Sequence, residues 1–222
     1  MKTTMRVAVA QMNSQDDVAA NLVAVEKRVA EAAASGAELV VLPENFAFMG
    51  GTDEQRRTVA ESLDGAGPIV RALARLARAH HVTIIGGGMP EQSGDPDRPH
   101  NTCVVVASTG EIVARYRKIH LFDVEVGDGQ TYRESAAVTP GDGPVAIDVG
   151  PLKLGLSVCY DLRFPELYRR LVDLGATALV VPAAFTLMTG KDHWHVLLRA
   201  RAIESQTYVL AAAQWGKHPK GR

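Results

Sequence analysis

The 222-residue sequence predicts an α/β fold in which helices cover largely parallel sheets. Short apolar runs alternate with segments of helical period up to residue 85, which is the pattern of βαβ units. The same alternation returns after residue 145. One stretch of the second half also matches one of the first in register, so we expect two related α/β layers.

The first half has the order strand, helix, strand, helix, strand. Apolar residues recur at helical spacing from Val18, and Gly36 ends that helix. Pro68 opens the second helix, because proline is favoured in a first turn. The expected elements are a strand at 7–10, the helix from 18, a strand at 39–42, the helix from 68 and a strand at 82–85. We expect Gly86-Gly87-Gly88 to break this last strand.

Two hairpins and a second alternation follow. Ser108-Thr109-Gly110 separates strands at 102–107 and 112–116, and Gly150-Pro151 separates strands at 145–149 and 152–158. Between the hairpins, residues 122–143 are polar and glycine-rich and form a long loop, a kind of segment that is often functional. The remaining elements are a helix at 165–174, a strand at 178–181, a helix at about 192–206 and a strand at 208–213.

Residues 36–49 align without gaps with residues 175–188, and Gly, Ala, Val, Pro, Phe and Met recur in register. Two such layers can bury their sheets against each other, so we expect a single domain over residues 1–222. The first copy carries Glu44 where the second carries Ala183. An acid that appears in one copy only, just past a buried strand, indicates a role in function rather than in folding.

Charge and composition exclude several classes of function. Lysine and arginine number 24 and aspartate and glutamate 25, for a formal net charge of −1, and no basic stripe suits a nucleic-acid backbone. No apolar stretch approaches the roughly 20 residues of a membrane-spanning helix, and the apolar run before Gln11 is too short for a signal peptide. Two cysteines far apart in sequence indicate a reducing compartment. We therefore expect a soluble cytoplasmic protein with neither a nucleic acid nor a membrane as partner.

Three reactive side chains, Glu44, Lys118 and Cys159, each follow the C-terminal end of an expected strand. Open α/β sheets bring functional groups together at such ends. A nearby ammonium lowers the pKa of a thiol, and a carboxylate can take the thiol proton and later deliver it to an amine. The lysine and the backbone N–H of Tyr160 can stabilise the oxyanion that forms at an attacked carbonyl. The three residues therefore predict a thiol hydrolase.

Four motifs resemble those of the nitrilase, or carbon–nitrogen hydrolase, superfamily, and the resemblance covers essentially the whole chain. They are Leu42-Pro43-Glu44-Asn45, Tyr116-Arg117-Lys118-Ile119-His120-Leu121-Phe122-Asp123, Cys159-Tyr160-Asp161-Leu162-Arg163-Phe164-Pro165-Glu166 and Arg199-Ala200-Arg201-Ala202-Ile203-Glu204. The resemblance implies an αββα four-layer sandwich. It implies Glu44 as general base and acid, Lys118 as oxyanion stabiliser and proton donor, and Cys159 as nucleophile. It also implies that a second glutamate, Glu134, positions the lysine and the substrate.

The motif that begins at Cys159 resembles the Nit amidase branch of the superfamily. That branch implies a cofactor-free hydrolase of a small carboxylate-bearing α-keto amide, such as deaminated glutathione, which acts through a cysteine thioester. The alternative is an ω-amidase acting on α-ketoglutaramate-like amides. We expect a homodimer or a higher homo-oligomer. Since members of the superfamily continue past the position of Arg222, we expect this chain to lack their usual C-terminal segment.

Five further residues are candidates for binding the substrate or supporting the reacting groups: Asp161, Arg163, Phe185, His193 and His195. Asp161 and Arg163 could instead form an internal ion pair that holds the loop after the nucleophile. His193-Trp194-His195 stands where the superfamily usually has His-Trp-Glu, which changes the local charge. Two histidines at i and i+2 do not share a helix face, so we predict no metal site.

Two functions of other classes remain open. The chain could be a catalytically silent interaction protein with the nitrilase fold, because His195 departs from the pattern of the superfamily. It could also be a cysteine–histidine hydrolase that uses His120 or His193 as its base.

Overall fold

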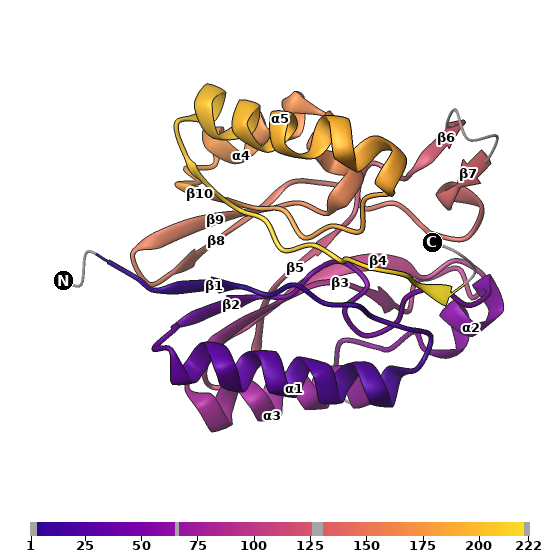
Figure 1. Cartoon of the computed structure of the whole chain (residues 1–222), viewed down its shortest axis with the longest axis horizontal. Helices are drawn as coiled ribbons and strands as arrows, with labels where there is room; N and C mark the ends of the chain where they lie inside the picture. The colour runs from indigo at the N-terminus through magenta and orange to yellow at the C-terminus, as the bar shows by residue number, and fades with distance from the viewer. Residues whose placement is uncertain (1–3, 65–66, 126–130, 220–222) are drawn as a thin grey trace.

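The computed structural model describes residues 4–64, 67–125 and 131–219. Two sheets lie face to face in the middle of the molecule, and helices cover the outer face of each (Figure 1). These four layers confirm the αββα sandwich expected from the sequence. Among the described residues, no helix is both long and apolar enough to cross a membrane.

The first sheet is built from the N-terminal half of the chain. Its strands, in spatial order, are β1 (Val7–Val9), β2 (Leu39–Val41), β3 (Thr83–Glu91), β4 (His100–Val106) and β5 (Ile112–Arg117). The first three strands are parallel, and β4 and β5 continue the sheet antiparallel. Its outer face carries two helices, α1 (Val18–Ala34) and α3 (Pro68–His80).

The second sheet is built from the C-terminal half. Its strands, in spatial order, are β11 (Tyr208–Leu210), β10 (Ala178–Val180), β9 (Leu152–Leu156) and β8 (Val145–Val149). The pairs β11–β10 and β10–β9 are parallel, and β8 is antiparallel to β9. Its outer face carries α4 (Pro165–Asp173) and α5 (Leu187–Ser205).

Side chains along β2 and at the residue after it point alternately to the two faces of the first sheet. Leu39 and Val41 belong to the apolar cluster between the two sheets, whereas Val40 and Leu42 belong to the cluster shared with α1 and α3. All four side chains are fully buried. Burial of such a side chain contributes roughly 1.5–3 kcal/mol, so β2 anchors the sandwich on both of its faces and holds the strand end after Leu42 rigidly.

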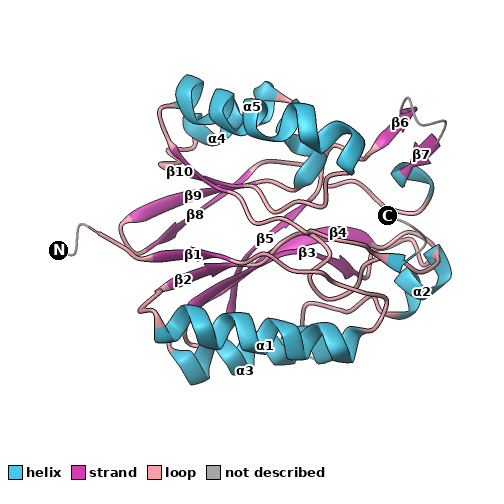
Figure 2. Ribbon diagram, in the orientation of Figure 1, coloured by secondary structure: helices cyan, strands magenta, loops and turns pink. Residues whose placement is uncertain are grey.

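Several short elements gather at one end of the sandwich (Figure 2). The hairpin of β6 (Asp123–Glu125) and β7 (Thr131–Arg133) lies at this end, and so does α2 (Asp53–Thr58). Two 3-10 helices complete the structure: η1 (Glu134–Ala136) and η2 (Cys159–Arg163). The segment expected as a loop, residues 122–143, therefore contains a hairpin and a helical turn. Thr52 and Gln55 form a capping box at the start of α2, a signal that the sequence carried.

The expected end of the third strand at Gly86-Gly87-Gly88 is wrong. The strand β3 runs through the glycines to Glu91, with an irregularity in its register between Gly86 and Met89. A Cβ on Gly86 would lie 3.0 Å from both Phe46 and Val104. The glycines are therefore required by close packing inside the sheet and do not end it. The boundary of α5 also differs, since it begins at Leu187 rather than near residue 192.

Gly87 packs against both halves of the molecule, and we expect Gly87→Ala to destabilise the protein. A Cβ there would clash with the carbonyl oxygen of Leu42 and the ring of Pro182. Overpacking of this kind costs about 1–3 kcal/mol, so the urea midpoint should fall. The matched control is Gly94→Ala, since no atom lies within 4 Å of its added Cβ. Equal midpoints for the two variants would contradict this account.

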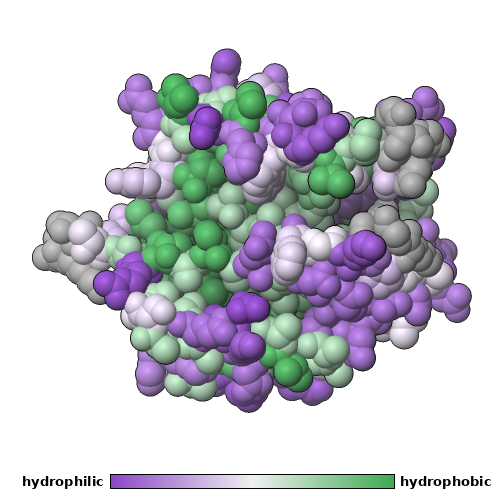
Figure 3. Space-filling view, viewed as in Figure 1, coloured by the Kyte–Doolittle hydropathy of each residue, from purple (hydrophilic) through white to green (hydrophobic). Residues whose placement is uncertain are grey.

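Apolar side chains gather on the surface between the two helical layers (Figure 3). The first sheet ends in β1 on one side and the second sheet ends in β11 on one side. Val9 on β1 and Tyr208 on β11 are both exposed. Within the described part of the chain, each sheet therefore has an edge that pairs on one side only.

Candidate active site

Four of the expected site residues come together between the two sheets. Glu44 follows β2, Lys118 follows β5, Glu134 begins η1 and Cys159 begins η2. Glu44, Lys118 and Cys159 are buried, and the Glu134 side chain is 16 % exposed. The strand ends thus place a thiol, an ammonium and two carboxylates in one sheltered region.

Lys118 lies between the two carboxylates. Its Nζ donates to Glu134 Oε2 at 2.8 Å and to Glu44 Oε1 at 3.2 Å. Burial lowers the pKa of this ammonium, but the charges of Glu134, Glu44 and Cys159 more than offset the burial, and the pKa is raised. Lys118 is therefore a fixed cation, able to stabilise negative charge but not to serve as a neutral base.

Glu134 remains ionised because the positive charge of Lys118 helps to offset its burial. Burial raises its pKa, but the charge and hydrogen bond of Lys118 and a 2.7 Å hydrogen bond from the Phe122 N–H lower it further than burial raises it. The Arg56 guanidinium adds to this lowering. Glu134 thus acts as a permanent counter-ion that orients the lysine.

Acid should weaken the folded state partly through Glu134. Because its folded pKa lies below its unfolded pKa of about 4.3, its contribution is complete above that pH and is lost as the pH falls through the folded pKa. We expect the free energy of unfolding of Glu134→Gln to fall less steeply below about pH 4.5 than that of the wild type. Urea titrations at several pH values measure this. The exposed Glu54→Gln is the control, and a slope for Glu134→Gln equal to that of the wild type would refute the prediction.

Glu44 is held by donors from both halves of the molecule. Its Oε2 accepts the N–H of Ala184 at 3.0 Å, and its Oε1 accepts Nδ2 of Asn101 at 2.9 Å. The next residue, Asn45, has a left-handed backbone with φ of 59°. Such a conformation costs energy in a residue with a side chain and persists where the surroundings hold it. The turn after β2 therefore aims the carboxylate inward.

Cys159 occupies a similar sharp turn, with φ of 51°. Its N–H donates to the carbonyl of Pro182 at 2.8 Å, which fixes the turn to the strand end after β10. Burial raises the pKa of the thiol, Glu44 raises it further, and the Ala184 N–H lowers it. The segment after β10 thus holds both the turn of Cys159 and the Glu44 carboxylate.

The expectation that Lys118 lowers the pKa of the Cys159 thiol is confirmed, but two larger effects oppose it. Burial and the charge of Glu44 raise the pKa of Cys159 well above its usual value, and Lys118 opposes them only in part. One cation already balances two carboxylates here, so a thiolate would add a further negative charge. The thiol therefore keeps its proton in the folded protein, and Glu44 is the carboxylate available to accept it.

A second group of side chains lies beside the thiol. The guanidinium carbon of Arg163 lies 5.8 Å from the ring centroid of Tyr160 and 5.5 Å from that of Phe185. The guanidinium also contacts Nδ1 of His193 at 3.2 Å, and Trp194 packs on Phe185. The Arg163 guanidinium is therefore held by aromatic rings, one of which belongs to Tyr160, the residue after Cys159.

Two of the further candidates do not belong to this second group. Asp161 is fully buried and pairs with His120 at 2.7 Å rather than with Arg163. The alternative of an Asp161–Arg163 ion pair is therefore wrong. His195 lies exposed on α5, and no hydrogen bond or ring contact within the described residues joins it to Arg163 or Cys159.

Sequence reasoning missed three groups that contact the candidate site. Asn101 bridges Glu44 and Glu134 through Nδ2, and the backbone N–H of Ala184 serves Glu44. Arg56 donates to the Asn45 side chain at 3.1 Å. The sequence offered an indication of Asn101, because it is a polar residue near the start of a strand that is buried along its whole length. The Ala184 N–H carried none, because a backbone donor is placed by the fold.

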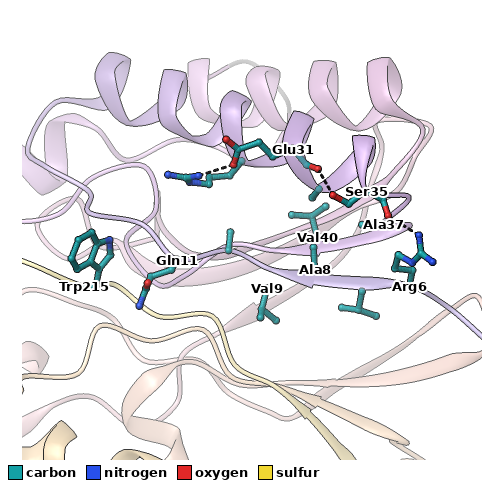
Figure 4. A pocket seen from close by; sticks show the side chains of 13 residues that line it. Arg6, Ala8, Val9, Gln11, Glu31, Ser35, Ala37, Val40 and Trp215 are labelled. Carbon is teal, nitrogen blue, oxygen red and sulfur yellow. Dashed lines mark hydrogen bonds and ion pairs between the residues drawn. The ribbon is translucent and has the colours of Figure 1, made fainter.

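A cavity of about 520 Å³ lies elsewhere, between β1 and α1 (Figure 4). Its charged residues already have partners, since Arg6 donates to the Ser35 carbonyl at 2.7 Å and Arg28 pairs with Glu31 at 2.6 Å. None of the four clustered residues lines it. Across residues 4–64, 67–125 and 131–219, no group of three or more metal-ligating side chains forms. Among the described residues, the thiol cluster is therefore the candidate active site.

Comparison with known proteins identifies a family. The carbon-nitrogen hydrolase family matches residues 6–222. The chain belongs to this family. It is therefore a hydrolase that acts on carbon–nitrogen bonds other than peptide bonds, and the amidase names of its relatives indicate linear amides as the class of bond.

Three relatives illustrate how this carbon-nitrogen hydrolase compares. It is 47% identical over 221 residues to a deaminated glutathione amidase of Synechocystis sp., covering 97% of this chain and 79% of the relative. It is 38% identical to a chloroplastic omega-amidase of Arabidopsis thaliana, covering 95% of this chain and 57% of the relative. The crystal structure of the C. elegans NitFhit protein superposes with a TM-score of 0.90 at 37% identity, covering 100% of this hydrolase and 54% of that chain.

Proposed function

We propose that this amidase hydrolyses a small α-keto amide that carries a carboxylate, such as deaminated glutathione, through a thioester on Cys159. The observation that carries the proposal is the ammonium of Lys118 held between two carboxylates, with Lys118 and Glu44 both acting on the pKa of the buried thiol. This arrangement supplies a nucleophile, a proton acceptor and an electrostatic stabiliser in one place.

The proposed reaction begins when the sulfur attacks the amide carbonyl and its proton passes to Glu44. Lys118 and the backbone N–H of Tyr160 stabilise the resulting oxyanion, and a donor of this kind is typically worth about 3–4 kcal/mol in the barrier. The carbon–nitrogen bond then breaks, and Glu44 returns the proton to the departing amine or ammonia. Water attacks the thioester, again losing its proton to Glu44, and releases the acid together with the free thiol.

Arg163 supports the choice of a substrate with a carboxylate. Its guanidinium is partly exposed, lies over two aromatic rings and sits four residues after the nucleophile. A guanidinium binds a carboxylate through two parallel hydrogen bonds. A partly exposed guanidinium four residues after the thiol favours an anionic substrate over a neutral amide.

An ω-amidase activity on α-ketoglutaramate-like amides is the second candidate, since a relative at 38% identity bears that name. The two candidates differ in the leaving group. A panel of α-keto amides therefore tests the proposal, with amine and ammonia as leaving groups and each substrate paired with an analogue lacking the carboxylate.

We expect a kcat/KM at least about 10-fold higher for the carboxylate-bearing member of each pair, and an acyl adduct on Cys159 in intact-mass and peptide measurements. Arg163→Gln should reduce that preference and leave the neutral analogue unchanged. No release from any amide, and no adduct, would instead indicate a catalytically silent protein with this fold.

A further inference from the structure

Asp161 collects four hydrogen bonds although it is fully buried. Its Oδ2 accepts the hydroxyl of Tyr116 at 2.7 Å and the N–H of Val158 at 2.8 Å. Its Oδ1 accepts Nδ1 of His120 at 2.7 Å and the N–H of the same residue at 3.1 Å. An ionised carboxylate has about four lone-pair sites, so these donors leave it no acceptor for a substrate.

The donors flank the two residues that would react with the substrate. Val158 immediately precedes Cys159, while Tyr116 and His120 lie two residues before and two residues after Lys118. The first of these segments belongs to the second sheet, and the other leaves β5 of the first sheet. The Asp161 carboxylate thus connects the segment at the end of β5, which carries Lys118, to the turn that carries Cys159.

The surroundings make these bonds strong and hard to replace. Burial and the negative charge of Asp161 raise the pKa of the Tyr116 phenol, so its hydroxyl remains a donor. The His120 ring stacks on Phe164, with centroids 3.8 Å apart and planes 7° from parallel, which fixes the direction of Nδ1. Hydrogen bonds to an ionised acceptor in a dry environment are roughly twice as strong as neutral ones.

We propose that Asp161 is a positioning residue that sets the distance between the thiol of Cys159 and the ammonium of Lys118 through these four donors. The proposal deepens and rests on the amidase function proposed above. Asp161 touches neither reacting atom in this scheme. His120 acts as a donor to it and not as a base for the thiol.

The two cysteines of the chain make a test with an internal control. Cys103 lies on β4 with 0 % exposure, so its alkylation reports opening of the core, whereas alkylation of Cys159 reports the geometry of the thiol. Both can be followed by iodoacetamide labelling and peptide mass measurement in one sample. The measurement needs no amide, so a protein inactive on every amide would overturn the proposed function without deciding this inference.

Asp161→Asn keeps the size of the side chain but replaces one acceptor with a donor. We expect labelling of Cys159 to slow at least about 10-fold between pH 6 and 9, and kcat to fall by more than KM rises, while Cys103 stays protected. Labelling of Cys159 within about twofold of the wild type, with Cys103 protected, would overturn the inference.

If Cys103 becomes labelled in Asp161→Asn, the core of that variant has opened. Variants of His120 then decide whether the inference holds. His120→Ala removes the Nδ1 donor, whereas His120→Asn places an amide donor near the same position without a titratable group. We expect the alanine variant to slow Cys159 labelling about 3- to 10-fold and the asparagine variant to restore it to within about twofold. An alanine variant that labels like the wild type, or an asparagine variant no better than alanine, would overturn the inference.

Discussion

Replacing Cys159 with alanine is expected to abolish amide hydrolysis, lowering kcat by at least about 10⁴-fold, because no other nucleophile is available to form the acyl intermediate. The substitution should change the reaction rate and not the stability of the fold. The Cys159 side chain is small, and its turn is held by the backbone N–H bonded to Pro182. Circular dichroism and the urea midpoint should therefore change little. Ammonia or amine release and intact-mass measurement check the loss of both turnover and adduct.

The matched control for this variant is Cys103→Ala. Cys103 is fully buried between the sheets, and burial raises the pKa of its thiol far above neutrality. Its loss should cost stability through a small cavity and leave kcat near the wild-type value. Retention of substantial turnover in Cys159→Ala, or equal loss in both variants, would count against a thioester on Cys159.

Lys118→Met should have the second largest effect on activity and stability, because it removes the cation and leaves two carboxylates without their counter-ion. We expect kcat to fall about 10²- to 10³-fold through loss of oxyanion stabilisation. The free energy of unfolding should also fall by about 3–5 kcal/mol, since the uncompensated charges of Glu44 and Glu134 remain buried. Initial rates and urea unfolding measure the two effects separately.

A double variant separates chemistry from stability at this position. Lys118→Met combined with Glu134→Gln removes one of the stranded charges, so we expect it to recover part of the lost stability and none of the lost turnover. A cysteine–histidine hydrolase based on His120 or His193 makes the opposite prediction, because its base does not involve Lys118. A pH–rate profile of Lys118→Met close to the wild-type profile would support that alternative.

The layers and the strand ends were predictable because each depends on local pattern. Apolar runs stop abruptly before Glu44 and Cys159, and a strand that is buried on both faces has few other ways to end. The resemblance to the nitrilase superfamily supplied Glu134, which local pattern would leave as an ordinary loop acid. The strand β3 was misjudged because a glycine run has the same letters in a turn and in a tightly packed strand.

The remaining contacts depend on residues far apart in the chain. The bond from Asn101 to Glu44 spans 57 positions, and the bond from the Ala184 N–H to Glu44 spans 140. Periodicity over a dozen residues contains no information on such distances. The same holds for the direction of the Cys159 pKa, which depends on how deeply the fold buries the sulfur and not on the presence of a lysine alone.

The division of the thiol cluster between the two sheets has a consequence for synthesis of the protein. A ribosome delivers Glu44, Lys118 and Glu134 first, then Cys159, and only afterwards the Pro182 carbonyl and Ala184 N–H that fix the turn and the acid. The turn of Cys159 and the Glu44 carboxylate therefore reach their final geometry only after residue 184 has been added to the growing chain.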